Sequence, residues 1–174
     1  METLIRFVVS NYFAVFFIIS LIVAWFKVKK SSRIESGKSI YEIYLSEFML
    51  YTVGWCNIVN FVFHVFFGEI SAGFIGWEDS PFQAEVGYAS LGMGIAGIMS
   101  YKRDFSFRFA ALIAPVIFYL GAAGGHIYEM VAYHNFSPGN VGLVLPFDII
   151  IPLCGLFFAY KVSRSLSSTR RGFD

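Results

Sequence analysis

The sequence predicts an all-α fold: a polytopic membrane protein with five transmembrane helices in one bundle. Hydrophobic residues make up 57% of the 174-residue chain and charged residues only 14%, and a water-soluble domain of this size could not bury so many apolar side chains. The apolar residues gather in stretches that each approach the ~20 residues needed to cross a bilayer. These stretches are Phe7–Phe26, Phe48–Phe67, Pro81–Tyr101, Phe107–Tyr128 and Val141–Tyr160. No repeat or linker divides them, so residues 1–174 are expected to form a single domain.

Local signals mark the ends of these stretches. The first stretch lacks the small-residue exit of a cleaved signal peptide and runs straight into Lys27, so it is expected to remain as a helix. Ser39 to Glu42 has the pattern of a capping box that starts the second helix, and Ser80 to Gln83 repeats this pattern at the third. The basic connection 102–106 separates the third stretch from the fourth, and the turn at 138–140 precedes the fifth.

The connections differ in charge, which predicts the orientation of the chain. Lys and Arg occur in connections 27–39 and 102–106 and in the tail after Tyr160, whereas connections 68–80 and 129–140 contain acidic residues and no Lys or Arg. Basic loops stay on the cytoplasmic side of a membrane. The N-terminus is therefore expected outside and the C-terminus in the cytoplasm, and Arg6 opposes this orientation.

Composition also restricts the partners of the chain. The formal net charge is +1, so no basic field favours a nucleic acid, and the lipid bilayer is the expected partner. Aromatic residues reach 20%, which suits membrane-interface belts or a surface for a second copy or for a membrane-complex partner. No nucleophile elbow, P-loop or dinucleotide fingerprint occurs, so the sequence leaves enzymatic activity undecided.

Ionisable residues inside the predicted helices fall at one depth once the chain is threaded through the bilayer. Each such group costs about 2.5–3.5 kcal/mol at membrane depth, so these residues are expected to face the bundle interior and to pair. The predicted site consists of His64, Glu85, His126, Glu129 and Asp148. Supporting polar residues in the same outer layer are Asn11, Asn57, Asn60 and Gln83.

Two of these carboxylates have distinctive surroundings. Glu85 shares a helical row with Ala89, Gly92 and Ala96, beside a second small-residue row of Ser90, Gly94 and Gly97. Small faces allow close packing, so we expect this helix to be central and Glu85 to be buried. Asp148 lies between Pro146 and Pro152, and Pro152 cannot donate to the carbonyl of Asp148. This break fits either a cation site of the transporter type or a plain kink.

Several functions fit this cluster. An outward-facing pocket that binds a cation or relays protons is the first interpretation. Imidazoles and carboxylates also suit zinc or iron, although the His126 to Glu129 run reverses the order used in di-iron bundles, and His64 with His126 could hold one haem b. In a second class, the polar residues only lock the helices of an accessory or assembly subunit. An enzyme acting on a lipid-soluble substrate such as a quinone is a third alternative.

One segment carries a resemblance to a known group of proteins. The run from Trp77 to Gly87, Trp-Glu-Asp-Ser-Pro-Phe-Gln-Ala-Glu-Val-Gly, is followed by a glycine-rich helix and later by Pro138-Gly139-Asn140. This pattern resembles an uncharacterised family of small multi-pass prokaryotic membrane proteins, mainly over residues 77–101. The resemblance implies a protein of a bacterial or archaeal inner membrane and assigns no activity.

Overall fold

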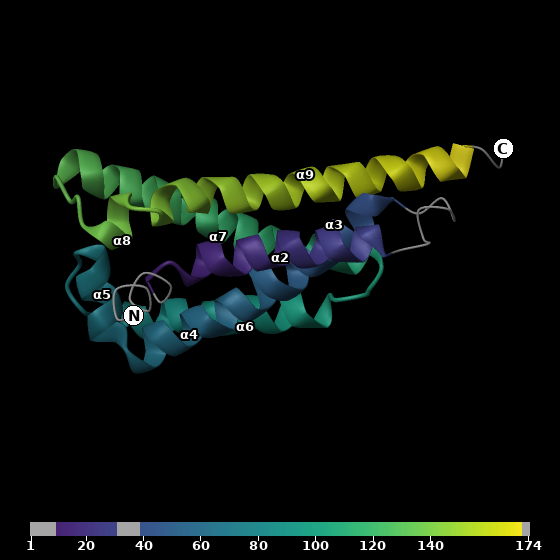
Figure 1. Ribbon diagram of the computed structural model, residues 1–174. Coiled ribbons are helices and arrows are strands. Elements are labelled where there is room, and N and C mark those ends of the chain that lie inside the picture. The colour runs from purple at the N-terminus through teal and green to yellow at the C-terminus, as the bar shows by residue number, and fades with distance from the viewer. Residues whose placement is uncertain (1–9, 31–38, 172–174) are drawn as a thin grey trace.

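The computed structural model describes residues 10–30 and 39–171, and within these residues every regular element is a helix. The predicted all-α class is confirmed. The elements are α2 (Tyr12–Lys29), α3 (Ile40–Glu47), the π-helix η2 (Phe48–Trp55), α4 (Cys56–Phe66), α5 (Gly68–Ile75), α6 (Phe82–Met99), α7 (Phe105–Ala132), α8 (Pro138–Val141) and α9 (Val144–Arg171). Figure 1 shows the long helices lying alongside one another, with the short α5 and α8 at one end.

Four helical segments of the described chain are long and apolar enough to cross a membrane. They are Tyr12–Lys29, Ile40–Phe66, Phe105–Ala132 and Pro138–Ser168. Many of their large side chains face outward, including Phe66 at 65% exposure and Ile117 at 67%. Water-exposed apolar surface of this extent is unfavourable, and together with the four long apolar helices it suggests a membrane protein. The predicted start of the first span, Phe7, lies outside the described residues.

The third predicted span, Pro81–Tyr101, forms α6, but this helix is not among those apolar enough to qualify. It has the same 18-residue length as α2. Gln83, Glu85 and several glycines lower its apolar character. The prediction of five spans is therefore supported for four of them, and the crossing of the membrane by α6 stays a prediction.

Helix α6 packs on η2 and α4 through its glycines. A Cβ atom added to Gly97 would lie 2.7 Å from the backbone nitrogen of Gly54, and one added to Gly94 would lie 3.0 Å from the Gly54 carbonyl oxygen. Ser90 lies in the same buried row. The prediction that Glu85 is buried is wrong, because the glycine row allows closer backbone approach and leaves the row of Glu85 exposed.

The helix starts differ in their capping. The Ser39 hydroxyl accepts a hydrogen bond from the backbone nitrogen of Tyr41 at 3.3 Å, so the predicted start of the second helix is confirmed. The predicted capping box at Ser80 is wrong, because α6 begins at Phe82 and the backbone oxygen of Ser80, rather than its hydroxyl, accepts from Gln83 at 3.0 Å. The π-helical stretch η2, which no sequence signal predicted, widens the middle of the segment that carries the predicted polar row.

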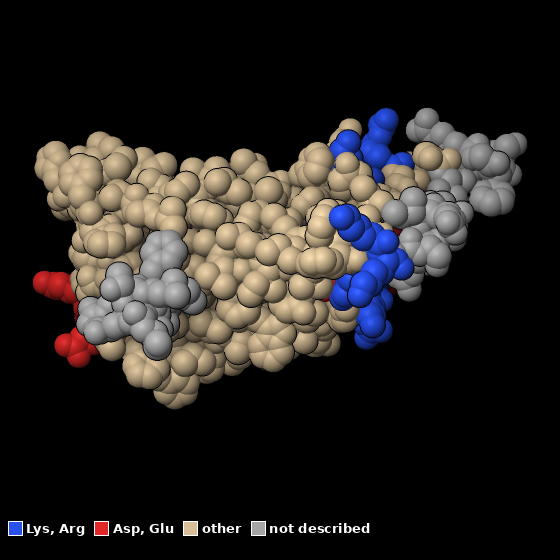
Figure 2. All heavy atoms as spheres, in the orientation of Figure 1, with Lys and Arg blue, Asp and Glu red and all other residues tan. Residues whose placement is uncertain are grey.

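Charge separates the two ends of the molecule. Figure 1 shows that one end of the molecule contains the end of α2, the start of α3 and the α6–α7 connection. The other end contains α5, α8 and the α5–α6 connection. Figure 2 shows Lys and Arg gathered at the first end and acidic side chains at the second. We call these the basic end and the acidic end. The core between them combines α2, α3, η2, α7 and α9 around Phe17, Phe48, Leu112 and Phe158.

Candidate functional site

A cavity of about 650 Å³ lies toward the acidic end, enclosed by α2, α4, α5, α6, α7 and α9. We call it the histidine cavity, because His64 and His126 both line it. Its walls are largely aromatic and aliphatic, including Phe63, Phe74 and Phe118. The polar side chains that converge on it include Tyr12, Asn60, His64, Gln83, Tyr119, His126 and Asp148. An apolar cavity of this size with a few converging polar groups is typical of a small-molecule or ion site.

His126 of α7 is held in one orientation by Asn140 of α8. The Nδ1 atom of His126 lies 2.7 Å from Oδ1 of Asn140. The amide nitrogen of Asn140 donates to the backbone oxygens of His126, at 3.1 Å, and Asn135, at 2.8 Å. Since these donations identify the nitrogen of the Asn140 amide, its oxygen faces the ring, and Nδ1 must carry a proton. Both side chains are buried, so this arrangement is protected from water.

The other ring nitrogen of His126 faces a carboxylate. Its Nε2 atom lies 3.6 Å from Oδ2 of Asp148 on α9, and the two side chains are only 7% and 13% exposed. With Nδ1 protonated, Nε2 of a neutral ring presents a lone pair, which would repel an ionised carboxylate. The pair is therefore favoured when it holds one further proton, either on the ring or on the carboxyl group. The 3.6 Å separation is an ion-pair distance and is longer than a direct hydrogen bond.

Trp77 covers the His126 ring from the loop between α5 and α6. The two ring centroids lie 6.0 Å apart with an interplanar angle of 28°. Gly76 ends α5 with φ of 84°, a left-handed conformation that favours glycine and turns the chain toward this position. Asn135 holds the same turn by donating to the backbone oxygen of Ile75 at 3.0 Å. An aromatic side chain thus shields one face of the imidazole.

Helices α4 and α6 meet at another polar pair in the cavity wall. The Nδ1 atom of His64 lies 2.6 Å from Oε1 of Gln83, whose side chain is buried. Nearby, the Tyr12 hydroxyl of α2 donates to Oδ1 of Asn60, and Nδ2 of Asn60 donates to the Ser90 hydroxyl at 2.7 Å. Three helices are therefore joined by one chain of hydrogen bonds. The Ser90 hydroxyl in turn donates to the backbone oxygen of Val86 at 2.9 Å, so this chain ends on the backbone of α6.

Asn57 adds a buried polar group on the α7 side. Its amide nitrogen donates to the Tyr119 hydroxyl and to the backbone oxygen of Val53, each at 2.8 Å. Its side-chain oxygen is buried and has no hydrogen-bond partner within the described part of the chain. A buried unpartnered oxygen is unfavourable, and this one lies behind the cavity, because Asn57 is not among the lining residues.

The structure brings some of the predicted site residues together and separates others. His64, His126, Asp148, Asn60 and Gln83 line the histidine cavity, and Asn57 lies buried behind it. Glu85 is exposed and Glu129 is half-buried, and neither lines the cavity. Asn11 occupies the N-cap position of α2. In the residues that the structure describes, no three His, Cys, Asp or Glu side chains gather as a metal-binding group, and zinc, iron and haem b stay predictions.

Sequence reasoning missed Tyr12, Trp77, Tyr119 and Asn140 as parts of this site. The two tyrosines lie in apolar stretches, where an aromatic residue is typical of packing, and Trp77 and Asn140 were assigned to loops. The signal that could have found Asn140 is its position in the turn before the last helix, because a turn at the end of α7 can return toward His126. Nothing in the sequence identifies the two tyrosines.

The comparisons with known proteins identify a family for this chain and no individual relative. No curated protein and no solved structure matches the chain. The Family of unknown function (DUF6790) matches residues 10–168. This match covers most of the chain, extends the resemblance first recognised over residues 77–101 and confirms that the family is uncharacterised. The chain therefore belongs to the family of unknown function DUF6790.

Proposed function

We propose that this protein is an integral membrane protein that binds and relays protons through the histidine cavity, with His126 and Asp148 as the proton-binding pair. One observation carries the proposal: Nε2 of His126 lies 3.6 Å from Oδ2 of Asp148 while Asn140 engages Nδ1. Because Nδ1 is occupied, a proton that enters or leaves the pair does so on the side of Nε2 and the carboxylate. That side lines the cavity.

The surroundings of the pair support proton exchange more than binding of a multivalent cation. Divalent cations prefer several oxygen ligands, or nitrogen and sulfur ligands in a tetrahedral set. Asp148 is the carboxylate closest to His126 among the described ion pairs. Glu78 and Cys56 also line the cavity, but within the described residues no three His, Cys, Asp or Glu side chains gather as a metal-binding group. A relayed proton needs a group that donates it and a group that accepts it, and His126 and Asp148 can take these two roles.

The proposal includes a topology. We place α6 across the membrane together with the four apolar segments, in one five-helix bundle with the N-terminus outside and the C-terminus in the cytoplasm of a prokaryotic cell. The contacts of α6 with η2 and α4 support its crossing, and the basic end supports the orientation. In this orientation the histidine cavity is near the outer surface.

Purified protein in liposomes that contain a pH-sensitive dye tests the proposal. A pH step across the membrane should cause proton entry faster than in empty liposomes, and Asp148→Asn should abolish this difference, because the amide cannot take up the proton. Glu129→Gln is the matched control, since it also removes a carboxylate but lies outside the cavity, and it should behave like the wild type.

Equal proton entry in wild type, Asp148→Asn and empty liposomes would reject the relay. The alternative from another class would then hold, in which the polar residues lock the helices of an accessory or assembly subunit. The mutual hydrogen bonds of His126 with Asn140 and of His64 with Gln83 are the observations that favour this alternative.

A further inference from the structure

Another cavity, of about 1350 Å³, opens at the basic end between α2, α3, the α6–α7 connection and α9. We call it the basic cavity. Its cationic lining residues are Lys27, Lys30, Lys102, Arg103 and Arg108, and its acidic lining residues are Glu42, Glu47 and Asp104. Cationic side chains are therefore in excess among the described lining residues, and Figure 2 shows several Lys and Arg side chains gathered at this end.

Two of the acidic residues already have partners. Oε1 of Glu47 lies 2.7 Å from Nζ of Lys27, in an ion pair whose carboxylate is buried. Oδ1 of Asp104 accepts a hydrogen bond from the backbone nitrogen of Phe107 at 3.0 Å and caps α7. These acids neutralise one lysine and one helix end. They leave the remaining cations of the cavity without an equal negative charge.

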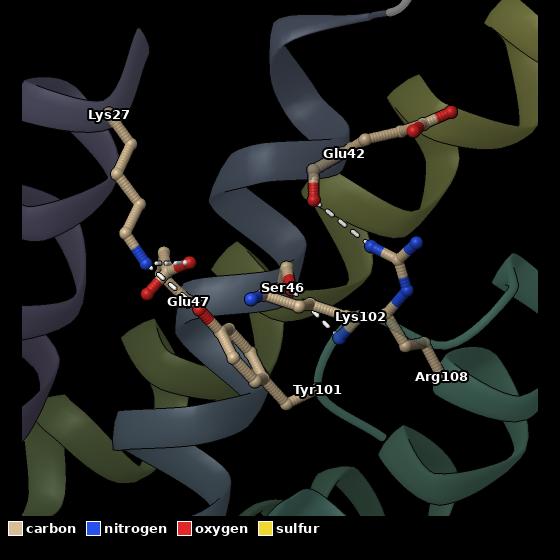
Figure 3. A network of polar contacts seen from close by, with 7 residues as sticks. All are labelled: Lys27, Glu42, Ser46, Glu47, Tyr101, Lys102 and Arg108. Carbon is tan, nitrogen blue, oxygen red and sulfur yellow. Dashed lines mark hydrogen bonds and ion pairs between the residues drawn. The ribbon is translucent and has the colours of Figure 1, made fainter. Parts of the chain in front are cut away.

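Among these cations, Arg108 gives the strongest evidence for a bound anion. It is only 7% exposed, and its Nη1 atom donates to the backbone oxygen of Glu42 at 3.0 Å. Figure 3 shows the Glu42 carboxylate turned away from this guanidinium, and the Lys27–Glu47 pair on the other side of Ser46 and Lys102. Within the described residues, Nε of Arg108 is buried without a hydrogen-bond partner and no carboxylate forms an ion pair with the side chain.

The charges of Glu42 and Asp104 act on Arg108 from a distance, but in the described part of the chain neither carboxylate forms a hydrogen bond or ion pair with its guanidinium. A buried cation that lacks a direct anionic partner is unfavourable, so an anion bound at Arg108 would complete the site. Guanidinium groups bind phosphate through two parallel hydrogen bonds, and the Nε atom is one of the donors that this geometry uses. Arg108 has one of its other nitrogen atoms occupied by Glu42 and retains Nε for such a ligand. The free Nε atom of Arg108 therefore favours a phosphate group as the ligand of the basic cavity.

The position of the cavity identifies the source of that phosphate. Arg108 lies in the first turns of an apolar helix of membrane-spanning length, so it is near the surface of the bilayer. The cavity wall also contains Phe26, which is 52% exposed, and Leu166, which is 41% exposed. Apolar side chains beside cations suit a molecule with an acyl chain below a charged headgroup. Basic pockets between membrane helices are known to hold anionic lipid headgroups.

We propose that the basic cavity binds the phosphate headgroup of an anionic phospholipid, with Arg108 as the central ligand and Lys30 and Lys102 as surrounding cations. Purified protein in neutral detergent is titrated with phosphatidylglycerol, with phosphatidylcholine and with inorganic phosphate, and the midpoint of thermal unfolding is followed. Phosphatidylglycerol should raise the midpoint saturably, whereas phosphatidylcholine should not. High salt should weaken the effect, because the contacts are electrostatic.

Arg108→Gln should weaken the apparent affinity for phosphatidylglycerol about fivefold or more, which corresponds to one lost cation near a membrane surface. The double variant Lys30→Gln/Lys102→Gln should give a similar loss, and it keeps the test valid if Arg108→Gln does not fold. Arg164→Gln is the matched control, since Arg164 is an exposed cation of α9 that does not line the cavity. It should bind as the wild type does.

The outcomes separate the alternatives. Equal stabilisation by both lipids, or wild-type affinity in both cavity variants, would overturn the site. Stabilisation by inorganic phosphate at the same concentration as phosphatidylglycerol, lost in the cavity variants, would support the anion site and overturn the lipid as its source.

Discussion

Gly54 of η2 and Gly97 of α6 bring the two helices into backbone contact. A Cβ atom on Gly97 would lie 2.7 Å from the nitrogen and 2.9 Å from the Cα atom of Gly54. These are backbone atoms, so no side-chain rotation can relieve the clash. This contact places α6 against the segment that carries Asn57, Asn60 and His64, and it thereby closes one wall of the histidine cavity.

We expect Gly97→Ala to destabilise the protein by about 1–3 kcal/mol, the usual cost of overpacking. The control is Gly92→Ala on the same helix, because a Cβ atom there meets nothing within 4 Å, and this variant should unfold as the wild type does or slightly later. Unfolding in mixed micelles with increasing denaturing detergent measures the difference. If both variants unfold alike, the close contact between η2 and α6 is not a feature of the protein in its membrane.

A second prediction concerns pH and the start of α7. The backbone N–H of Phe107 donates to the Asp104 carboxylate and holds its pKa below the usual value, and nearby Arg103 acts in the same direction. The pKa of Asp104 is lower in the folded than in the unfolded chain. This cap therefore stabilises the protein fully at pH values above the unfolded pKa of about 3.9. The contribution is lost as pH falls through the lower, folded value.

Thermal unfolding between about pH 3 and pH 6 measures this loss in wild type and in Asp104→Asn. Asparagine still caps the helix but does not titrate in this range. The difference between the two proteins should therefore shrink on acidification. A difference that is constant across this range would mean that the Asp104 charge does not contribute to the stability of the folded protein.

The sequence predicted where the helices of this protein lie along the chain better than it predicted which face of each helix is buried. Runs of apolar residues identify membrane helices because the bilayer imposes a minimum length, and four of the expected stretches are found as such helices. The face that a helix buries depends on its neighbours. Helix α6 has two small-residue rows, and it buries the row with Gly94 and Gly97 because Gly54 of η2 lies opposite. Only the tertiary structure shows that Glu85 is on the other side.

The site shows the same limit. His64, His126 and Asp148 were predicted because an ionisable side chain in an apolar helix needs a partner, and all three line one cavity. Their actual partners, Gln83 for His64 and Asn140 for His126, depend on distances between helices. Glu129 was included because it is one helical turn from His126. One turn of α7 is enough to move it out of the cavity.

The contact between Asn140 and His126 gives a third prediction. Asn140→Leu removes the acceptor of Nδ1 and leaves the backbone oxygens of His126 and Asn135 without their side-chain donor. We expect a loss of about 1–3 kcal/mol in unfolding free energy, since buried polar groups lose their partners. Nitrogen NMR of labelled histidine should also show that the protonated Nδ1 form of His126 is no longer favoured. An unchanged His126 spectrum in a folded variant would contradict the assigned tautomer.

A last prediction concerns the topology on which the proposed outer position of the histidine cavity depends. A reporter fused after Asp174 should be active only in the cytoplasm, and single cysteines placed in 69–79 or 131–139 should react with a membrane-impermeant reagent added outside. Variants with cysteines near Lys102 serve as the control, because the basic end is expected inside. A cytoplasmic C-terminus together with a cytoplasmic 131–139 segment would show that α9 does not cross the membrane. An external C-terminus with labelling of the basic end from outside would invert the molecule, and the histidine cavity would then open toward the cytoplasm.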